Sequence, residues 1–232
     1  TNPEHKIIIC GDLFDRGNQS VECYDFIKDM LEHGRLIYVK GNHEELLEHC
    51  VRDVKLGRMC SHHISNGTIR TLASFMSCSE YDILCDCYEG TKFNKVTKEL
   101  LDFIDNNSVD YYELGDKVFV HGWVPTGTVS DTDMTMDVKD NWREGNWAQA
   151  RWENGMELAH FGLVVPNKTV VCGHWHTSWG HSRYHHDGDE WDGASANFNP
   201  YYDDGIIAID ACTAYTRMIN VVVFDDEGKE VT

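Results

Sequence analysis

Eight residues in four short segments have side chains that can bind metal ions or phosphate. They are Asp12, Asp15, Arg16, Asn42, His43, His121, His174 and His176. Oxygen and imidazole ligands together suit manganese, iron or zinc rather than calcium. An arginine can bind a phosphate through two parallel hydrogen bonds. One such segment alone is equally well explained by a surface turn with an ion pair, but four of them indicate a shared metal site.

Each of the four segments follows an apolar run that is typical of a buried strand. These runs cover residues 7–10, 36–39, 117–120 and 169–172. Between the first two, apolar residues recur at helical spacing after Ser20, a good N-cap, and before Gly34, a good terminator. Strand, helix and strand predict a right-handed crossover and a parallel sheet. Ligands bind at the carboxyl ends of such strands, so we expect the polar residues at one edge.

The other segments complete an α/β pattern, which we expect to form a single domain over residues 1–232. Residues 44–75 are helical but interrupted, with a solvated patch at 61–63. A further helix ends at 106–107, and a hairpin turns at Gly115 and Asp116. We expect loops or a small cap at 125–146 and a loop at 180–204, in which His185 and His186 are exposed. A turn or short helix at 147–152 and strands at 205–210 and 218–224 complete the pattern.

The composition argues against several classes of protein. The chain has 39 acidic and 20 basic residues and a formal charge of -19. This charge repels nucleic acid and anionic lipid, so neither is an expected partner. The sequence has no apolar run of membrane-spanning length and no signal-peptide character, which favours a cytoplasmic location. The oligomeric state stays open.

The nine cysteines are an odd number and follow no disulfide framework. Cys10 and Cys172 lie in apolar runs, where a thiol behaves as a small hydrophobe. Cys85 and Cys87 form a C-x-C pair without the second pair that a zinc site would need. We therefore expect reduced thiols.

A mixed ligand set of this kind can hold two ions bridged by one carboxylate. Two ions about 3.5–4 Å apart bind both the entering and the leaving oxygen of an in-line phosphoryl displacement, and they lower the pKa of a bridging water. The sequence therefore predicts phosphoryl transfer to water.

Four motifs, in this order, resemble the calcineurin-like metallophosphoesterase superfamily. They are G-D-L-F-D-R-G at 11–17, G-N-H-E at 41–44, V-H-G at 120–122 and G-H-W-H at 173–176. The D-R-G and G-N-H-E forms are most similar to the phosphoprotein phosphatase branch and its bacterial and phage relatives. The resemblance implies a sandwich of two mixed β-sheets flanked by helices, with the site at the carboxyl ends of the strands.

The resemblance also implies a role for each residue. Asp12 bridges two metal ions, and His176 belongs to the first of them. The second ion is completed by Asn42, His121 and His174. His43 is the general acid, oriented by Asp15, while Arg16 binds phosphate oxygens. Arg151 is either a second phosphate ligand or an ordinary helix-surface charge, and Glu44 is expected only to favour the start of its helix.

The activity that the resemblance implies is hydrolysis of phosphomonoesters, including phosphoserine and phosphothreonine in proteins. A hydroxide bridging two divalent ions attacks directly, without a phosphoenzyme. Manganese is the expected metal, with iron, zinc, nickel and magnesium as alternatives.

The chain departs from the family pattern at its start. Family members open with a D-x-H strand that binds the first metal, and no D-x-H precedes Gly11. We expect that a strand and a helix are missing from the sequence at this end. Two other functions therefore stay open: a symmetrical dinucleoside-tetraphosphate hydrolase, and an inactive phosphate-binding protein if the D-x-H strand is truly absent.

Overall fold

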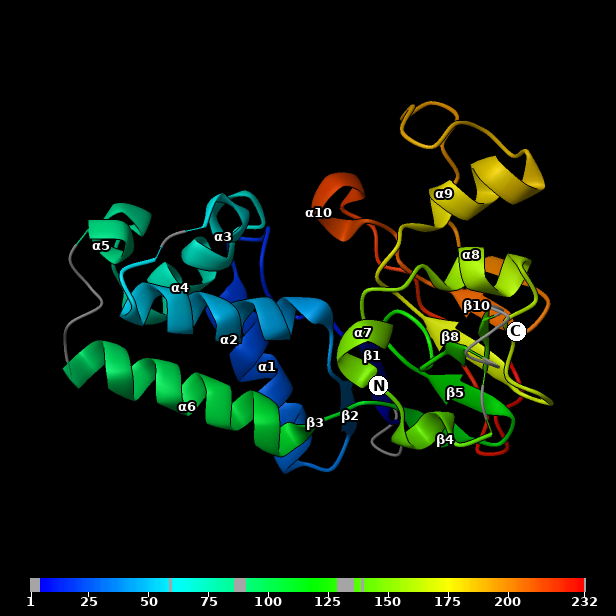
Figure 1. Cartoon of the computed structure of the whole chain (residues 1–232), viewed down its shortest axis with the longest axis horizontal. Coiled ribbons are helices and arrows are strands. Elements are labelled where there is room, and N and C mark those ends of the chain that lie inside the picture. Colours follow the sequence, from blue (N-terminus) through cyan, green and yellow to red (C-terminus); the bar gives the residue numbers. More distant parts are fainter. Residues whose placement is uncertain (1–4, 59, 86–90, 129–135, 139, 232) are drawn as a thin grey trace. The chain divides into compact units, whose positions relative to one another are not determined.

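The computed structural model describes residues 5–58, 60–85, 91–128, 136–138 and 140–231. The chain forms two compact units, Thr1–Val109 and Asp110–Thr232. Each unit contains one main β-sheet with helices packed against it (Figure 1). The α/β class with two sheets flanked by helices is therefore confirmed.

The sheet of the first unit has the order β1-β2-β3 and is parallel throughout. Its strands are β1 (Ile7–Cys10), β2 (Leu36–Val39) and β3 (Ser108–Val109). Helix α1 (Ser20–Glu32) connects the first two, so the predicted strand–helix–strand unit is confirmed. Gly34 follows α1 with a φ of +64°, a conformation in which glycine carries no steric cost.

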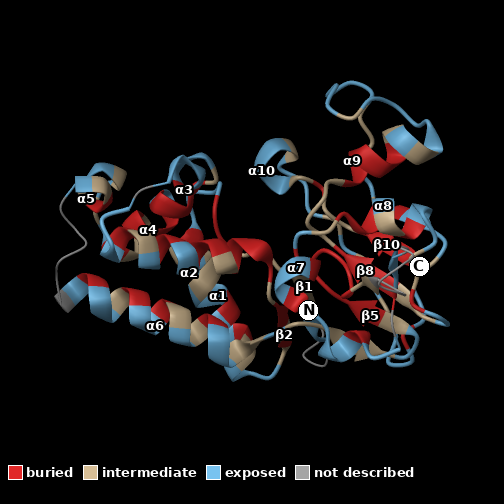
Figure 2. Ribbon diagram, viewed as in Figure 1, coloured by how far each residue is buried: buried red, intermediate tan, exposed pale blue. Residues whose placement is uncertain are grey.

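Helices follow β2 in the first unit, as the interrupted pattern predicted. They are α2 (Asn42–Lys55), α3 (Ser61–Ser65), α4 (Thr68–Met76), α5 (Glu80–Cys85) and α6 (Thr91–Asn107). The apolar faces of α2, α4, α5 and α6 meet in one core that includes the fully buried Leu47, Ile69 and Leu72. Figure 2 shows that α2 is most deeply buried near its amino-terminal end, where Asn42 and His43 lie.

The predicted solvated patch at 61–63 is wrong in one residue. His62 is exposed, but His63 is only 3% exposed, and its Nε2 lies 3.0 Å from Asp53 Oδ2. The hydrogen bond from His63 holds the pKa of Asp53 below its usual value, although desolvation opposes the shift. The carboxylate compensates the cost of burying the imidazole, which residue types alone do not reveal.

The sheet of the second unit is mixed and has the order β4-β5-β8-β10-β9. Its strands are β4 (Tyr112–Leu114), β5 (Lys117–Phe119), β8 (Thr169–Cys172), β9 (Tyr201–Asp203) and β10 (Ile206–Ala208). The antiparallel β4–β5 hairpin turns at Gly115 and Asp116 as predicted. The parallel strands β5, β8 and β10 form the centre, and Val118, Val170 and Ile206 are fully buried there.

Short elements surround this sheet. They are β6 (Gly127–Thr128), β7 (Met136–Asp137), η1 (Trp142–Glu144), α7 (Trp147–Ala150), α8 (Gly155–His160), α9 (Thr177–Gly180), η2 (His181–His185) and α10 (Thr213–Thr216). The segment at 180–204 is thus more ordered than predicted, because it contains η2 and β9. His185 and His186 are exposed, as expected.

The strand predicted at 218–224 is wrong. Within the described residues this segment makes only an isolated bridge, between Phe224 and Glu230. Ile219 and Val221 are 77% and 75% exposed. An apolar sequence with β propensity forms a strand only where another strand pairs with it, and the sequence cannot name that partner.

Two further expectations concern the cysteines and membrane-spanning helices. No disulfide joins the described cysteines; Cys85 is among them, whereas Cys87 lies outside the described residues. Of the described helices, none has the length and apolar character needed to cross a membrane.

Candidate metal and phosphate site

The loop after β1 has an unusual backbone. Asp12, Asp15 and Arg16 have φ values of +55°, +72° and +56°. Such left-handed conformations are uncommon for residues other than glycine and cost of order 1–3 kcal/mol each, so they persist only where surrounding contacts fix them. Strain of this kind concentrates at functional sites, and here it falls on three of the predicted site residues.

Glu44 supplies part of the contacts that fix this loop. Its carboxylate is buried and accepts backbone N–H bonds from Leu13 at 2.8 Å, from Asp12 at 3.1 Å and from Gly41 at 2.6 Å. The bond to Gly41 belongs to the capping arrangement of α2, while the other two tie that helix to the β1 loop. Glu44 therefore does more than the helix-start role that its sequence position suggested.

Gly41 allows the two segments to approach. A Cβ at this position would lie 2.4 Å from Asp12 N and 2.5 Å from Asp12 Oδ1. Asn42 and His43, the next residues and the first two of α2, are 2% and 3% exposed. The His43 backbone N–H donates to Asp12 Oδ1 at 3.1 Å. The glycine of the G-N-H-E motif is thus required by close packing.

His43 and Asp15 form the pair that the motifs implied. His43 Nδ1 donates to Asp15 Oδ2 at 2.7 Å, and the Asp15 side chain is fully buried. The opposite ring nitrogen, Nε2, lies 3.9 Å from Asp12 Oδ2. Burial lowers the pKa of His43, but the hydrogen bond to Asp15 and the charges of both aspartates outweigh it, so the pKa lies above its usual value. The imidazole is therefore disposed to carry a proton beside Asp12.

Arg16 lies at the surface end of this group. Its side chain is exposed, and its Nη2 donates to Asn66 Oδ1 at 3.1 Å. This bond uses one of the five donors of a guanidinium. The remaining donors are sufficient for a bidentate contact with a phosphate.

His121 and His174 follow β5 and β8 in the second unit, as the strand-end pattern predicted. Their ring centroids lie 4.9 Å apart. Gly173 N donates to His121 O at 2.8 Å, and His174 has a φ of +67°. His174 Nε2 lies 3.2 Å from Trp152 O and donates to it, which orients the ring.

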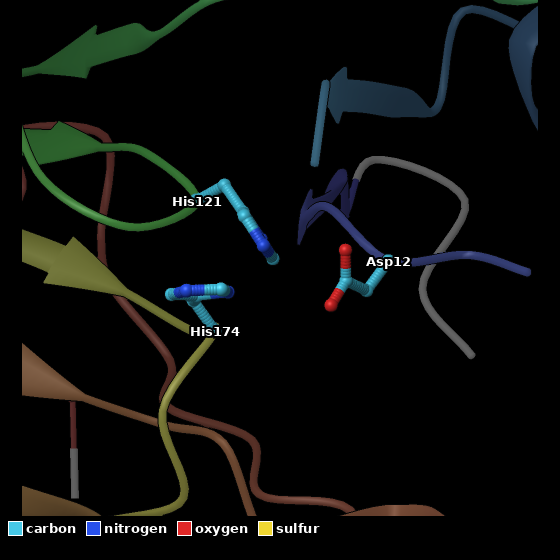
Figure 3. A group of neighbouring side chains, drawn as sticks. All are labelled: Asp12, His121 and His174. Carbon is cyan, nitrogen blue, oxygen red and sulfur yellow. The ribbon is translucent and has the colours of Figure 1, made fainter. Parts of the chain in front are cut away.

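Asp12, His121 and His174 form a candidate metal site. Each offers one ligand atom, and these atoms all lie within 4.8 Å of one another. Figure 3 shows the three side chains directed toward one another. One carboxylate and two imidazoles fit manganese, iron or zinc.

His176 does not belong to this group of three. Its Nδ1 lies 2.9 Å from Ser178 Oγ, its Nε2 lies 3.4 Å from Glu190 Oε1, and its ring lies 4.2 Å from that of Trp191. Burial lowers the pKa of His176 and outweighs the opposing charges of nearby carboxylates, including Glu190. Burial therefore favours the neutral form of this ring.

Arg151 is not an ordinary surface charge. It is only 7% exposed and forms an ion pair with Asp110 through Nη2. It follows directly after α7, whose carbonyls approach Gly122: a Cβ on Gly122 would lie 2.5 Å from Ala150 O. The solvated alternative for Arg151 is therefore wrong, because α7 and the V-H-G segment pack in direct contact.

Sequence reasoning gave Glu44 only a helix-start role and missed two further residues that hold the site, Thr68 and Thr71. Both threonine hydroxyls donate to the Asp15 carboxylate at 2.7 Å. Glu44 carried a signal, because a glutamate three residues after an N-cap is typical of a capping arrangement. The threonines carried none, since they lie more than 50 residues from Asp15 in the chain.

Comparison with known proteins agrees with this geometry. The chain matches the family of calcineurin-like phosphoesterases over residues 2–202. It therefore belongs to that family of metallophosphoesterases, which are hydrolases that act on phosphoesters and typically bind metal ions. A search of curated proteins gives no match.

Proposed function

We propose that the protein is a metal-dependent phosphomonoesterase of the phosphoprotein phosphatase type. The observation that carries the proposal is the buried His43–Asp15 pair beside Asp12, at 2.7 Å and 3.9 Å respectively. A metal ligand adjacent to an imidazole that can donate a proton is the arrangement needed to cleave a phosphate ester whose leaving oxygen must gain a proton.

Each residue has one role in this proposal. Asp12, Asn42, His121 and His174 would hold one ion, and His176 would contribute, together with Asp12, to the other. His43 protonates the leaving oxygen, and Asp15 orients the ring. Divalent ions bound here would supply a water of lowered pKa and neutralise phosphate charge.

Phosphate is bound in this proposal by Arg16, with Arg151 as the second candidate. Arg16 is exposed and its fork matches the tetrahedral oxygens of a phosphate. Its charge is also useful in a chain whose net charge of -19 repels anions. Binding therefore depends on local positive charge rather than on the overall field.

The test is hydrolysis of p-nitrophenyl phosphate by metal-free protein with manganese added back. We expect turnover that requires the metal and that is lost in Asp12→Asn and His121→Ala. Absence of turnover, with metal bound, would instead favour an inactive phosphate-binding protein.

A dinucleoside-tetraphosphate hydrolase is the second candidate, and one observation favours it. Trp191 and Tyr215 are 50% and 56% exposed, and their rings meet edge to face at 5.8 Å beside His176. Exposed aromatic rings can stack on a nucleobase. Comparing a phosphoserine peptide with a dinucleoside tetraphosphate separates the two functions, and Trp191→Ala should impair only the second.

A further inference from the structure

We propose that residues 66–71, Asn66 to Thr71, form a positioning segment for the active site, with one half orienting Asp15 and the other orienting Arg16. This inference rests on the proposed function, in which Asp15 orients the general acid and Arg16 binds phosphate. The segment reads as Asn-Gly-Thr-Ile-Arg-Thr and covers the turn before α4 and the first turn of that helix.

Two threonines hold the carboxylate of Asp15 from both sides. Thr71 Oγ1 donates to Asp15 Oδ1 at 2.7 Å, and Thr68 Oγ1 donates to Oδ2 at 2.7 Å. Oδ2 also accepts a hydrogen bond from His43 Nδ1. With three donors on two oxygens, rotation of the carboxylate would break bonds on both sides at once, so the direction of the His43 ring is fixed.

Thr71 also fixes the backbone that carries this carboxylate. Its Oγ1 accepts the Asp15 backbone N–H at 3.2 Å, and Ser20 Oγ lies 3.4 Å away. Asp15 is one of the residues with a positive φ, so a contact that holds its N–H opposes relaxation of the strained backbone.

The other half of the segment holds Arg16. The backbone N–H of Arg16 donates to Asn66 O at 3.2 Å, and its guanidinium donates to Asn66 Oδ1 at 3.1 Å. Gly67 has a φ of +84°, and a Cβ there would lie 2.8 Å from Arg16 N. Only glycine therefore combines this turn with the close approach of the Arg16 backbone.

A purely local role for these residues does not explain the contacts. Threonines near a helix start commonly cap the helix with their hydroxyls. The N-cap of α4 is Gly67, and no side chain caps that end. Thr68 and Thr71 are 0% and 1% exposed, and their hydroxyls are directed at Asp15. Their polar atoms are thus committed to the loop that carries the predicted catalytic groups.

The test separates the half of the segment that orients Asp15 from the half that orients Arg16, because substitutions in them should change kcat and KM respectively. Thr68→Val and Thr71→Val remove hydroxyls at similar volume, so each should lower kcat for a phosphoserine peptide about 10- to 100-fold, the effect of one hydrogen bond to a charged group. The rate with p-nitrophenyl phosphate should fall much less, because nitrophenolate leaves without a proton. Thr68→Ser and Thr71→Ser should restore the peptide rate.

Asn66→Ala should behave differently. It removes one bond to the guanidinium and should raise KM for both substrates about tenfold, leaving the ratio of their kcat values unchanged. Asn106→Ala, an exposed asparagine in the same unit, is the matched control and should leave both constants unchanged.

Thr97→Val is the control for the threonines. Thr97 is fully buried in α6, and its hydroxyl donates to Phe93 O at 2.8 Å, within its own helix. A merely destabilised protein would lose activity toward both substrates equally. If kcat falls by the same factor for both substrates in Thr68→Val and Thr71→Val, the positioning role is wrong.

A spectroscopic readout keeps the inference independent of turnover. The NMR resonance of the His43 Nδ1 proton should move in Thr68→Val and Thr71→Val and stay in place in Thr97→Val. An unchanged resonance overturns the inference even if the protein hydrolyses no substrate. Lack of turnover alone, with the resonance moved, counts against the proposed function and leaves the positioning role supported.

Discussion

At the scale of single residues, the site depends on buried polar groups that satisfy one another. Asp15 is surrounded by donors, and Glu44 accepts three backbone N–H groups. Removing one partner of a buried hydrogen bond leaves the other group with neither a protein partner nor water to bind. This costs more free energy than the hydrogen bond itself contributes. Conservative substitutions here should therefore have large effects.

His43→Gln should lower turnover of substrates with poor leaving groups by about two to four powers of ten, because it removes the general acid. Metal content should stay unchanged, since the metal group consists of Asp12, His121 and His174. Turnover is measured as steady-state rates with alkyl and nitrophenyl phosphates. Metal content is measured by elemental analysis. Equal rates in the variant and the wild type would remove His43 from the acid role.

Glu44→Gln should destabilise the protein by about 1.5–3 kcal/mol, because an amide nitrogen would then face buried backbone N–H groups. Both carboxylate oxygens accept such bonds now. Chemical denaturation measures the change. Glu48→Gln, an exposed position on the same helix, should change the free energy of unfolding by far less.

At the scale of elements, apolar runs that end at a glycine or valine were sufficient to predict the strands that the candidate site residues follow. Four such runs became β1, β2, β5 and β8. The same reasoning failed at 218–224, because periodicity reports a preference for extended backbone and not the presence of a partner strand. It also missed Thr68 and Thr71, whose function depends on contacts between distant parts of the chain.

Glu113 on β4 should make the second unit sensitive to acid. Arg143 of η1 donates to its carboxylate at 2.6 and 3.0 Å, and Lys168 lies 3.0 Å away. The bond from Arg143, helped by Lys168 and opposed by desolvation, lowers the pKa of Glu113 from 4.5 to about 2. A lowered pKa stabilises the fold above the unfolded value, and this stabilisation is lost as the pH falls from 4.5 toward 2.

Glu113→Gln should therefore lose less stability than the wild type as the pH falls from 4.5 toward 2. Denaturation midpoints of the variant and the wild type should converge near pH 2 and differ most at neutral pH. Glu227→Gln, at an exposed position in the same unit, should follow the wild-type curve. A parallel offset between Glu113→Gln and the wild type at every pH would exclude this linkage.

At the scale of the whole molecule, the net charge of -19 and the function oppose each other. A chain with 39 acidic and 20 basic residues repels a phosphate dianion, so the affinity for substrate must come from a few local cations. The sequence shows this conflict and also its solution, because the segment that holds Asp12 also contains Arg16. What it could not show is how the ligands are oriented, since that depends on the left-handed backbone at Asp12 and His174.

Metal should therefore stabilise the folded protein as well as activate it. A ligand that binds only the native state raises stability by about 2.7 kcal/mol at 100 times its dissociation constant. Adding manganese to metal-free protein should raise the thermal midpoint in a concentration-dependent way, and a chelator should reverse the rise. His121→Ala and His174→Ala remove ligands of the candidate site and should abolish the shift, whereas His185→Ala, an exposed histidine of η2, should keep it. A full shift in the two ligand variants would place the metal elsewhere and overturn the assignment of Asp12, His121 and His174.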